Sequence, residues 1–298
     1  MSPSEGILNW DIVALLGINS LSGHWLIDWT VNLVAQNKLL NGSVFVAAYW
    51  YCWFGGGSDD TLKSRRVVLA GLASCLLAIV IARALADLLP FRVRPMLDPA
   101  SGFQPPLFPV TDDYEAWSSF PSDKAAFVFA LAVALYAAVP RLSIALVIYA
   151  AAVVCLPRIW LGIHFPLDIL VGAAIGALAA WLCETFISRR LLDRLVALAE
   201  RRQALFYAVA FVVTIELAYL FDNVRRTARA VKALLGGSSF QVAVLLIAGA
   251  AGAVLLAGFA VKRAIDWRRS RRRVAAEVAD RPARSVKSTD APVSPRCL

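Results

Sequence analysis

The sequence predicts an all-α integral membrane protein, a helical bundle of about six to seven membrane helices with an amphipathic N-terminus. Hydrophobic residues make up 59% of the 298 residues and charged residues only 17%, and the mean hydropathy is +0.66. Soluble domains are about half apolar and about a quarter charged. The apolar runs are close to the roughly 20 residues that span a bilayer, and they lack the alternation of strands. Helices also satisfy their own backbone hydrogen bonds in lipid.

The chain divides into five predicted segments. Residues 1–38 keep apolar residues at helical spacing but interrupt them with polar ones, so we expect interfacial helices there. Residues 39–187 form a membrane core, 188–203 a basic cytoplasmic linker, 204–266 two additional membrane helices, and 267–298 a basic tail that we expect to be disordered. The expected membrane runs lie near 39–56, 66–89, 122–139, 142–157, 166–187, 204–221 and 240–262.

The net charge of +9 is spread in a way that favours a membrane over a nucleic-acid partner. Basic clusters such as "LKSRR" (62–66) and "RRSRRR" (268–273) lie beside the ends of apolar runs. Cytoplasmic loops of membrane proteins carry this excess of Lys and Arg. With the C-terminus in the cytoplasm, the loop 90–120 falls outside; only "VRRTARAVK" (224–232) departs from this rule. The five cysteines show no metal-ligand spacing.

Three polar clusters fall on this outer face. They are "FRVRP" with Arg92 and Arg94, "PSDK" with Ser122, Asp123 and Lys124, and "PRIWLGIHFPLD" with Arg158, His164 and Asp168. An ionisable group at membrane depth costs roughly 2.5–3.5 kcal/mol on insertion scales, so several together predict a functional site.

The residue types suit phosphate chemistry. Arginine binds phosphate oxygens in bidentate fashion, and Ser122 reads as a helix start whose free amides favour an anion. His164 and Asp168 are four residues apart, so on a helix they share a face. Simpler explanations remain: Arg92 is equally explained as an arginine that reaches for headgroups, and a lone His-Asp pair is often only a hydrogen-bonded anchor. The acidic residues Asp112, Asp113 and Glu115 fit a solvated loop better than an ion site.

Together these motifs resemble the type 2 phosphatidic acid phosphatase superfamily, most closely its bacterial undecaprenyl-diphosphate phosphatase branch. The resemblance rests on Arg158-x5-His164-x3-Asp168, with Pro-Ser-Asp at 121–123 and Arg94-Pro95 before it. It implies a six-helix core in the bacterial inner membrane, with the site facing the periplasm or extracellular side. It also implies a phosphohistidine at His164 oriented by Asp168, and no metal or other cofactor. The phosphate-binding residues that it implies are Arg94, Arg158, Ser122 and Asp123.

Three positions depart from the family pattern. Asp87 stands where the first motif usually has lysine, Pro157 where the third has serine, and Lys124 where the second has the histidine that protonates the leaving group. Lysine, with a pKa of about 10.4, is poorly matched to proton donation near neutral pH. Lys124 therefore either donates a proton with an altered pKa or only neutralises phosphate charge.

The leaving group bears on the substrate. A diphosphate expels a phosphate whose second pKa is about 6, which can leave without an acid. We therefore expect hydrolysis of a polyprenyl diphosphate, with lipid phosphates and membrane lipids as partners. Two alternatives stay open: a phosphotransferase using the same intermediate, and a non-catalytic binder of lipid phosphates. The second histidine, His24, is expected on an interfacial helix away from the site.

Overall fold

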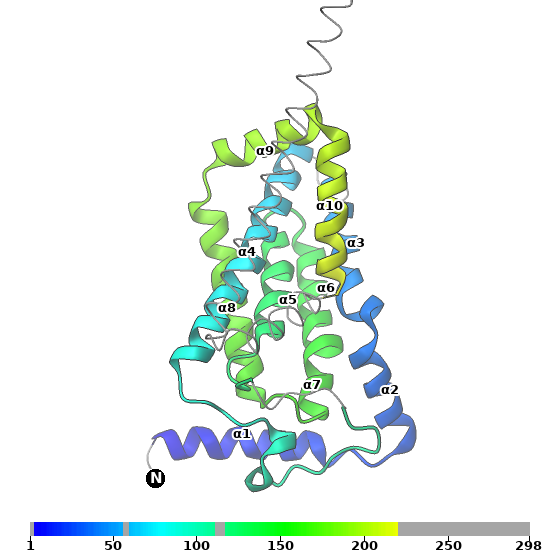
Figure 1. Cartoon of the computed structure of the whole chain (residues 1–298), viewed down its shortest axis with the longest axis vertical. Coiled ribbons are helices and arrows are strands. Elements are labelled where there is room, and N and C mark those ends of the chain that lie inside the picture. Colours follow the sequence, from blue (N-terminus) through cyan, green and yellow to red (C-terminus); the bar gives the residue numbers. More distant parts are fainter. Residues whose placement is uncertain (1–2, 56–59, 111–116, 220–298) are drawn as a thin grey trace, which may run out of the picture. The chain divides into compact units, whose positions relative to one another are not determined.

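The regular elements of the protein are helices throughout the part of the chain that can be described. The computed structural model describes residues 3–55, 60–110 and 117–219, all within one unit, Met1–Gly249 (Figure 1). Three of these helices are long and apolar enough to cross a membrane: Thr61–Leu88, Pro140–Trp160 and Pro166–Phe186. The all-α membrane fold is thus confirmed. The expected run 240–262, the tail 267–298 and the acidic residues 112, 113 and 115 lie outside the described residues.

The centre of the bundle is formed by α4 (Thr61–Leu88), α5 (Asp123–Ala134) and α8 (Pro166–Phe186), which pack against one another. Two glycines let α8 approach α5 closely. A Cβ atom on Gly172 would lie closer than 3.0 Å to the carbonyl oxygen of Ser122, and one on Gly176 would lie equally close to that of Ala126. The small residues therefore bring the first turn of α5 against the first turns of α8.

A second membrane-length helix is irregular in its middle. α6 (Pro140–Tyr149) runs through the π-helical segment η5 (Ala150–Cys155) into α7 (Leu156–Trp160). Pro157 lacks an N–H and its ring crowds the carbonyl four residues earlier, which is a common cause of such irregularity. The residue that replaces the family's serine thus lies just beyond this irregular segment.

The N-terminal residues form two helices, α1 (Pro3–Asn19) and α2 (Trp25–Gln36), which contact α7 at one end of the bundle (Figure 1). Asn19 exchanges two hydrogen bonds of 2.8 Å with the backbone of Gln104, in the loop after α4. Trp25 and Trp29 stack on each other and remain exposed. This exposed aromatic face suits the membrane interface, where such rings are enriched.

The remaining helices complete the bundle. They are η1 (Leu39–Ser43), α3 (Val44–Trp53), η2 (Pro95–Leu97), η3 (Pro99–Ser101), η4 (Leu135–Ala137), α9 (Arg189–Arg201) and α10 (Gln203–Ala218). The basic segment predicted at 188–203 contains α9, which packs on α4, buries Leu192 and Val196, and pairs Asp193 with Arg66 at 2.6 Å. Cys52, Cys75, Cys155 and Cys183 are free and buried, which is common for cysteines that act as small core residues.

Candidate active site

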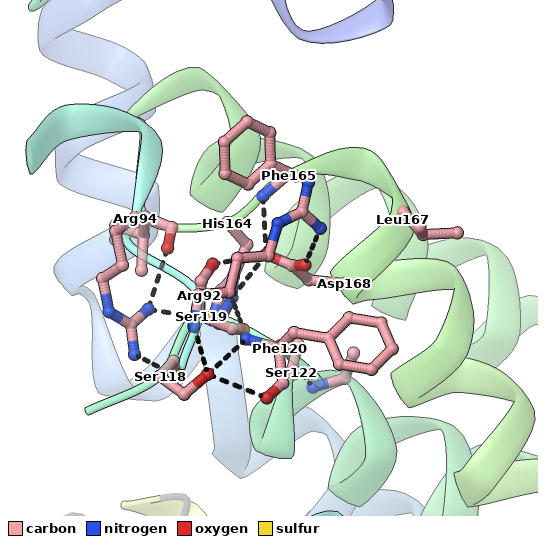
Figure 2. Close-up of polar contacts among 12 residues, drawn as sticks. Arg92, Arg94, Ser118, Ser119, Phe120, Ser122, His164, Phe165, Leu167 and Asp168 are labelled. Carbon is pink, nitrogen blue, oxygen red and sulfur yellow. Dashed lines mark hydrogen bonds and ion pairs between the residues drawn. The ribbon is translucent and has the colours of Figure 1, made fainter. Parts of the chain in front are cut away.

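The three polar clusters of the sequence meet beside α1: Figure 2 draws residues of all three close together, and Arg92 of the first cluster pairs with Asp11 of α1. Arg94 lies in the loop after α4, residues 118–122 lead into α5, and His164 lies in the turn between α7 and α8. The backbone links them directly: the amide of Ser122 donates to the carbonyl of Asp168 at 3.1 Å, and that of Met96 donates to the carbonyl of Gly162 at 2.9 Å.

His164 is held in one defined orientation. The turn that carries it needs the left-handed backbone of Gly162, whose φ is +69°. The Nδ1 atom of His164 lies 2.9 Å from the carbonyl oxygen of Ser119. A carbonyl can only accept, so Nδ1 carries the proton and Nε2 keeps its lone pair. Nε2 lies 3.5 Å from an NH group of Arg94. The unprotonated nitrogen, Nε2, therefore faces the Arg94 guanidinium, which is expected to bind phosphate.

Burial keeps His164 neutral. It lowers the pKa of His164 to about 4, and the charges of Arg94 and Arg158 lower it further, while Asp168 opposes them. A neutral imidazole is the form that can act as a nucleophile. Burial therefore favours the neutral form of this histidine near neutral pH.

Asp168 makes more contacts than the motif alone implies. At the third position of α8, its Oδ2 accepts from the amide of Phe165 at 2.8 Å and from the hydroxyl of Ser119. Its Oδ1 accepts from Arg92 at 2.6 Å, and the distance from its Oδ2 to His164 Nδ1 is 3.6 Å. The nearest acceptor to Nδ1 is therefore the Ser119 carbonyl. Asp168 acts on His164 mainly through its charge.

Arg94 and Arg158 are both buried beside His164. Arg94 donates to the carbonyls of Ile163 at 2.8 Å and Ser118 at 3.3 Å. Arg158 is 4% exposed, its Nε is buried without an acceptor, and no group among the described residues accepts a hydrogen bond from its guanidinium. A buried cation without a counterion is costly. The Arg158 guanidinium is therefore suited to an anion that enters the site.

The second cluster begins α5. Ser122 is the N-cap, and its hydroxyl accepts from the amide of Ala125 at 3.4 Å. Lys124 lies half-buried in the first turn. Asp123, expected among the phosphate-binding residues, instead pairs with Arg83 at 2.8 Å. A carboxylate repels phosphate, so its contacts favour a different role, holding Arg83.

Arg83 belongs to no motif that marks it in the sequence. The first-motif lysine position, Asp87, is exposed near the end of α4, whereas Arg83, one turn earlier, is buried. Besides the ion pair with Asp123, its guanidinium lies 5.0 Å above the Trp117 ring. The cation that α4 contributes near the second cluster is thus Arg83.

Arg92, Ser119 and Asp11 also contact the predicted residues. Arg92 lies between the carboxylates of Asp168 and Asp11, at 2.6 and 2.5 Å, with the Phe165 ring 3.9 Å from its guanidinium. The alternative that Arg92 only reaches for headgroups is therefore wrong. Its second carboxylate, from α1, had no motif to mark it.

His24 is exposed at the start of α2. Among the described ranges, no three His, Cys, Asp or Glu side chains gather as a metal site.

The central part of the chain is similar to known proteins. Residues 67–191 match the PAP2 superfamily model. Two solved structures are similar: LpxE of Aquifex aeolicus (25% identity, TM-score 0.41, covering 58% of this chain and 93% of that one), and the transmembrane PAP2 type phosphatidylglycerolphosphate phosphatase of Bacillus subtilis (22% identity, TM-score 0.38, covering 62% and 89%). No curated protein matches significantly.

Proposed function

Because residues 67–191 form a PAP2 superfamily domain, we propose that this membrane protein is a lipid phosphatase that hydrolyses a polyprenyl diphosphate through a phosphohistidine at His164. The main support for the proposal is that a neutral imidazole lies near a buried guanidinium that has no acceptor among the described residues. His164 presents Nε2 to Arg94, while the buried Arg158 guanidinium has no acceptor among the described residues. A phosphate bound by both arginines would neutralise this charge and meet the nucleophile.

In the first step, the lone pair of His164 Nε2 attacks the terminal phosphorus. The N–P bond forms, the P–O bond to the lipid-linked phosphate breaks, and its electron pair goes to the leaving oxygen. The ring becomes cationic, and it stays oriented because Nδ1–H still donates to Ser119. Asp168, 3.6 Å from Nδ1, stabilises the new positive charge.

In the second step, a water oxygen attacks the phosphorus of the phosphohistidine. The N–P bond breaks, its electron pair returns to Nε2, and the proton lost by water goes to solvent or to the departing phosphate. Arg94, Arg158 and the amides of the first turn of α5 stabilise charge on the phosphoryl oxygens in both steps. None of these roles needs a metal ion, and we propose that the reaction uses none.

Lys124 decides which substrates react well. It lies on the first turn of α5, beside the N-cap Ser122, where a cation adds to the positive end of the helix. We propose that Lys124 neutralises the β-phosphate of a diphosphate and transfers no proton. Losing a general acid costs about 10²–10⁴-fold in rate, and the loss is smallest when the leaving group is itself a phosphate.

The position of the site indicates where the substrate comes from. The helix α1 and the start of α2, which carries the exposed tryptophans, lie at the end of the bundle where α7 leads into α8, whereas the basic α9 is at the other end (Figure 1). By the positive-inside rule, we propose that α9 and the C-terminus are cytoplasmic and that the site faces the periplasm or the outside of a bacterial cell membrane. A lipid headgroup would then enter from the outer leaflet.

The test is phosphate release in detergent from undecaprenyl diphosphate and from phosphatidic acid. We expect release from the diphosphate, at least tenfold slower release from phosphatidic acid, and loss of both in His164→Ala. His24→Ala is the matched control, since His24 is the only other histidine and is exposed. Transfer of phosphate to an added alcohol without release would indicate the phosphotransferase. Binding without turnover in the wild type would indicate the non-catalytic protein, and turnover restored by Lys124→His would then assign that loss to Lys124.

A further inference from the structure

A buried carboxylate on α1 reaches the active-site charges, although α1 lies outside the matched family domain of residues 67–191. Among residues 10–19 of this helix, whose side chains the structure describes, Asp11, Leu15 and Asn19 are buried on one face. Asp11 is fully buried, although a buried carboxylate is costly unless it is paired and hydrogen-bonded. One oxygen of Asp11 accepts from the amide of Leu167 at 2.8 Å, and the other pairs with Arg92 at 2.5 Å. Both contacts lie next to Asp168.

The three side chains Asp11, Arg92 and Asp168 form a charge triad. Two carboxylates flank one guanidinium, so the triad carries one net negative charge. With Arg92 and Asp168 alone, the net charge would be zero. The carboxylate of Asp168 is the member that lies 3.6 Å from His164 Nδ1 (Figure 2). The triad beside His164 therefore carries a net negative charge only because α1 supplies Asp11.

The net negative charge of the triad affects one step of the proposed reaction. The other charged groups that act on His164 are Arg94 and Arg158, which both disfavour a cationic ring. The ring becomes cationic when Nε2 bonds to phosphorus. A net negative triad is the group that can offset those arginines at that point, and its effect increases in a low-dielectric site.

We propose that Asp11 of α1 is a positioning residue that keeps Asp168 negative toward His164 by sharing the charge of Arg92. It touches neither substrate nor nucleophile and acts through Arg92. The proposal rests on the proposed function for its effect on turnover, but its electrostatic content is independent of any substrate. It also assigns the N-terminal helix to the active site, so removing α1 would impair catalysis as well as membrane seating.

The first test measures turnover. Asp11→Asn is nearly isosteric and makes the triad neutral. We expect kcat to fall about tenfold. This is the size of effect expected when one unit charge is removed at a separation of about one side chain, with an effective dielectric constant of about 20. KM should change less than twofold, because the charge acts once the ring is cationic. The double variant Asp11→Asn/Arg92→Gln restores the single negative charge on Asp168. It should recover most of the lost kcat.

The second test needs no substrate. The chain has only two histidines, so selective ¹³C-histidine labelling allows the pKa of His164 to be followed by NMR in detergent. It should be highest in Arg92→Gln, where the triad carries two negative charges, intermediate and similar in the wild type and the double variant, and lowest in Asp11→Asn. Each step should be about one unit.

Asp28→Asn is the structural control. Asp28 is as buried as Asp11, lies on α2, and accepts from the amides of Gly23 and Leu107 and from Trp160. The Asp28→Asn variant should have a lower melting temperature, but the pKa of His164 and the value of kcat/KM should not change. If Asp11→Asn behaves in the same way, Asp11 is only an anchor and the proposal is wrong. If the pKa order holds but the wild type releases no phosphate, the proposed function fails and the role of Asp11 stands.

Discussion

The imidazole of His164 donates its Nδ1 proton to the backbone carbonyl of Ser119 at 2.9 Å, while the carboxylate of Asp168 lies 3.6 Å from the same atom. Tautomer and charge are therefore controlled by different groups. The carbonyl keeps the proton on Nδ1 and leaves Nε2 free. The carboxylate, bound to Ser119, Phe165 and Arg92, supplies the negative potential.

This division predicts a graded effect for Asp168→Asn. The Ser119 carbonyl still sets the tautomer, so attack by Nε2 remains possible, but the charge that stabilises the cationic ring is lost. We expect kcat to fall about 10²-fold, whereas His164→Ala should reduce it to background. Trapping the phosphohistidine with labelled substrate checks this: it should form slowly in Asp168→Asn and not at all in His164→Ala. Equal loss in both variants would mean that Asp168 also controls the tautomer.

The pH dependence follows from the buried position of His164. With a pKa of about 4, about 90% of His164 remains neutral at pH 5, against about 3% for an ordinary histidine of pKa 6.5. After correction for substrate ionisation, kcat/KM should therefore change little between pH 7 and pH 5. The same lowered pKa predicts that stability contributed by neutral His164 is complete above pH 6.5 and is lost as the pH falls toward 4. An activity loss centred near pH 6.5 in the corrected profile would contradict the buried setting.

Replacing Arg158 is expected to raise the stability of the protein and to lower its activity. Its buried guanidinium has no acceptor among the described residues, so Arg158→Met removes an uncompensated charge and keeps most of the volume. We expect the free energy of unfolding to rise by about 1–3 kcal/mol while phosphate release falls more than 10²-fold. Inorganic phosphate or vanadate should raise the melting temperature of the wild type only. A destabilised Arg158→Met variant would instead indicate a structural role.

Arg83 and Asp123 predict a coupled pair. Both side chains are largely buried and lie 2.8 Å apart, so Asp123→Asn leaves Arg83 charged without this carboxylate. Such a change should lower stability by about 3 kcal/mol. Adding Arg83→Gln should recover part of that loss, which thermal unfolding of the two single variants and the double variant measures as a cycle. Additive losses would exclude coupling through this ion pair.

Gly172 tests the packing that positions the site. An alanine there would bring its Cβ closer than 3.0 Å to the Ser122 carbonyl, which belongs to the N-cap of α5. Gly172→Ala should lower stability by about 2 kcal/mol and reduce kcat, because α5 and α8 must move apart. Gly17→Ala is the matched control, since a Cβ there would meet no neighbouring atom within 4 Å; it should be neutral or stabilise α1 by up to about 1 kcal/mol. Similar effects for both would show that close packing at Gly172 is unimportant.

The class of the protein and most residues of the candidate site could be predicted from the sequence alone. A long apolar run indicates a helix that can lie in lipid, and the runs predicted near 66–89, 142–157 and 166–187 correspond to the helices Thr61–Leu88, Pro140–Trp160 and Pro166–Phe186. Arg94, Arg158 and His164 could be assigned to one candidate site because ionisable groups at membrane depth are costly, and several of them together favour a function. The spacing of His164 and Asp168 at one helical entry was likewise local information.

How those groups are paired depends on the tertiary structure. Asp11, Arg92 and Asp168 come from α1, a loop and α8, and no local pattern in the chain marks that their charges meet. The same holds for Arg83 and Asp123, and for the Ser119 carbonyl, a backbone group that no residue type can mark. Burial and charge pairing depend on distances between segments far apart in the chain. Those distances are set by how α1, α4, α5 and α8 pack, and they determine which of the charges near His164 lie beside an opposite charge.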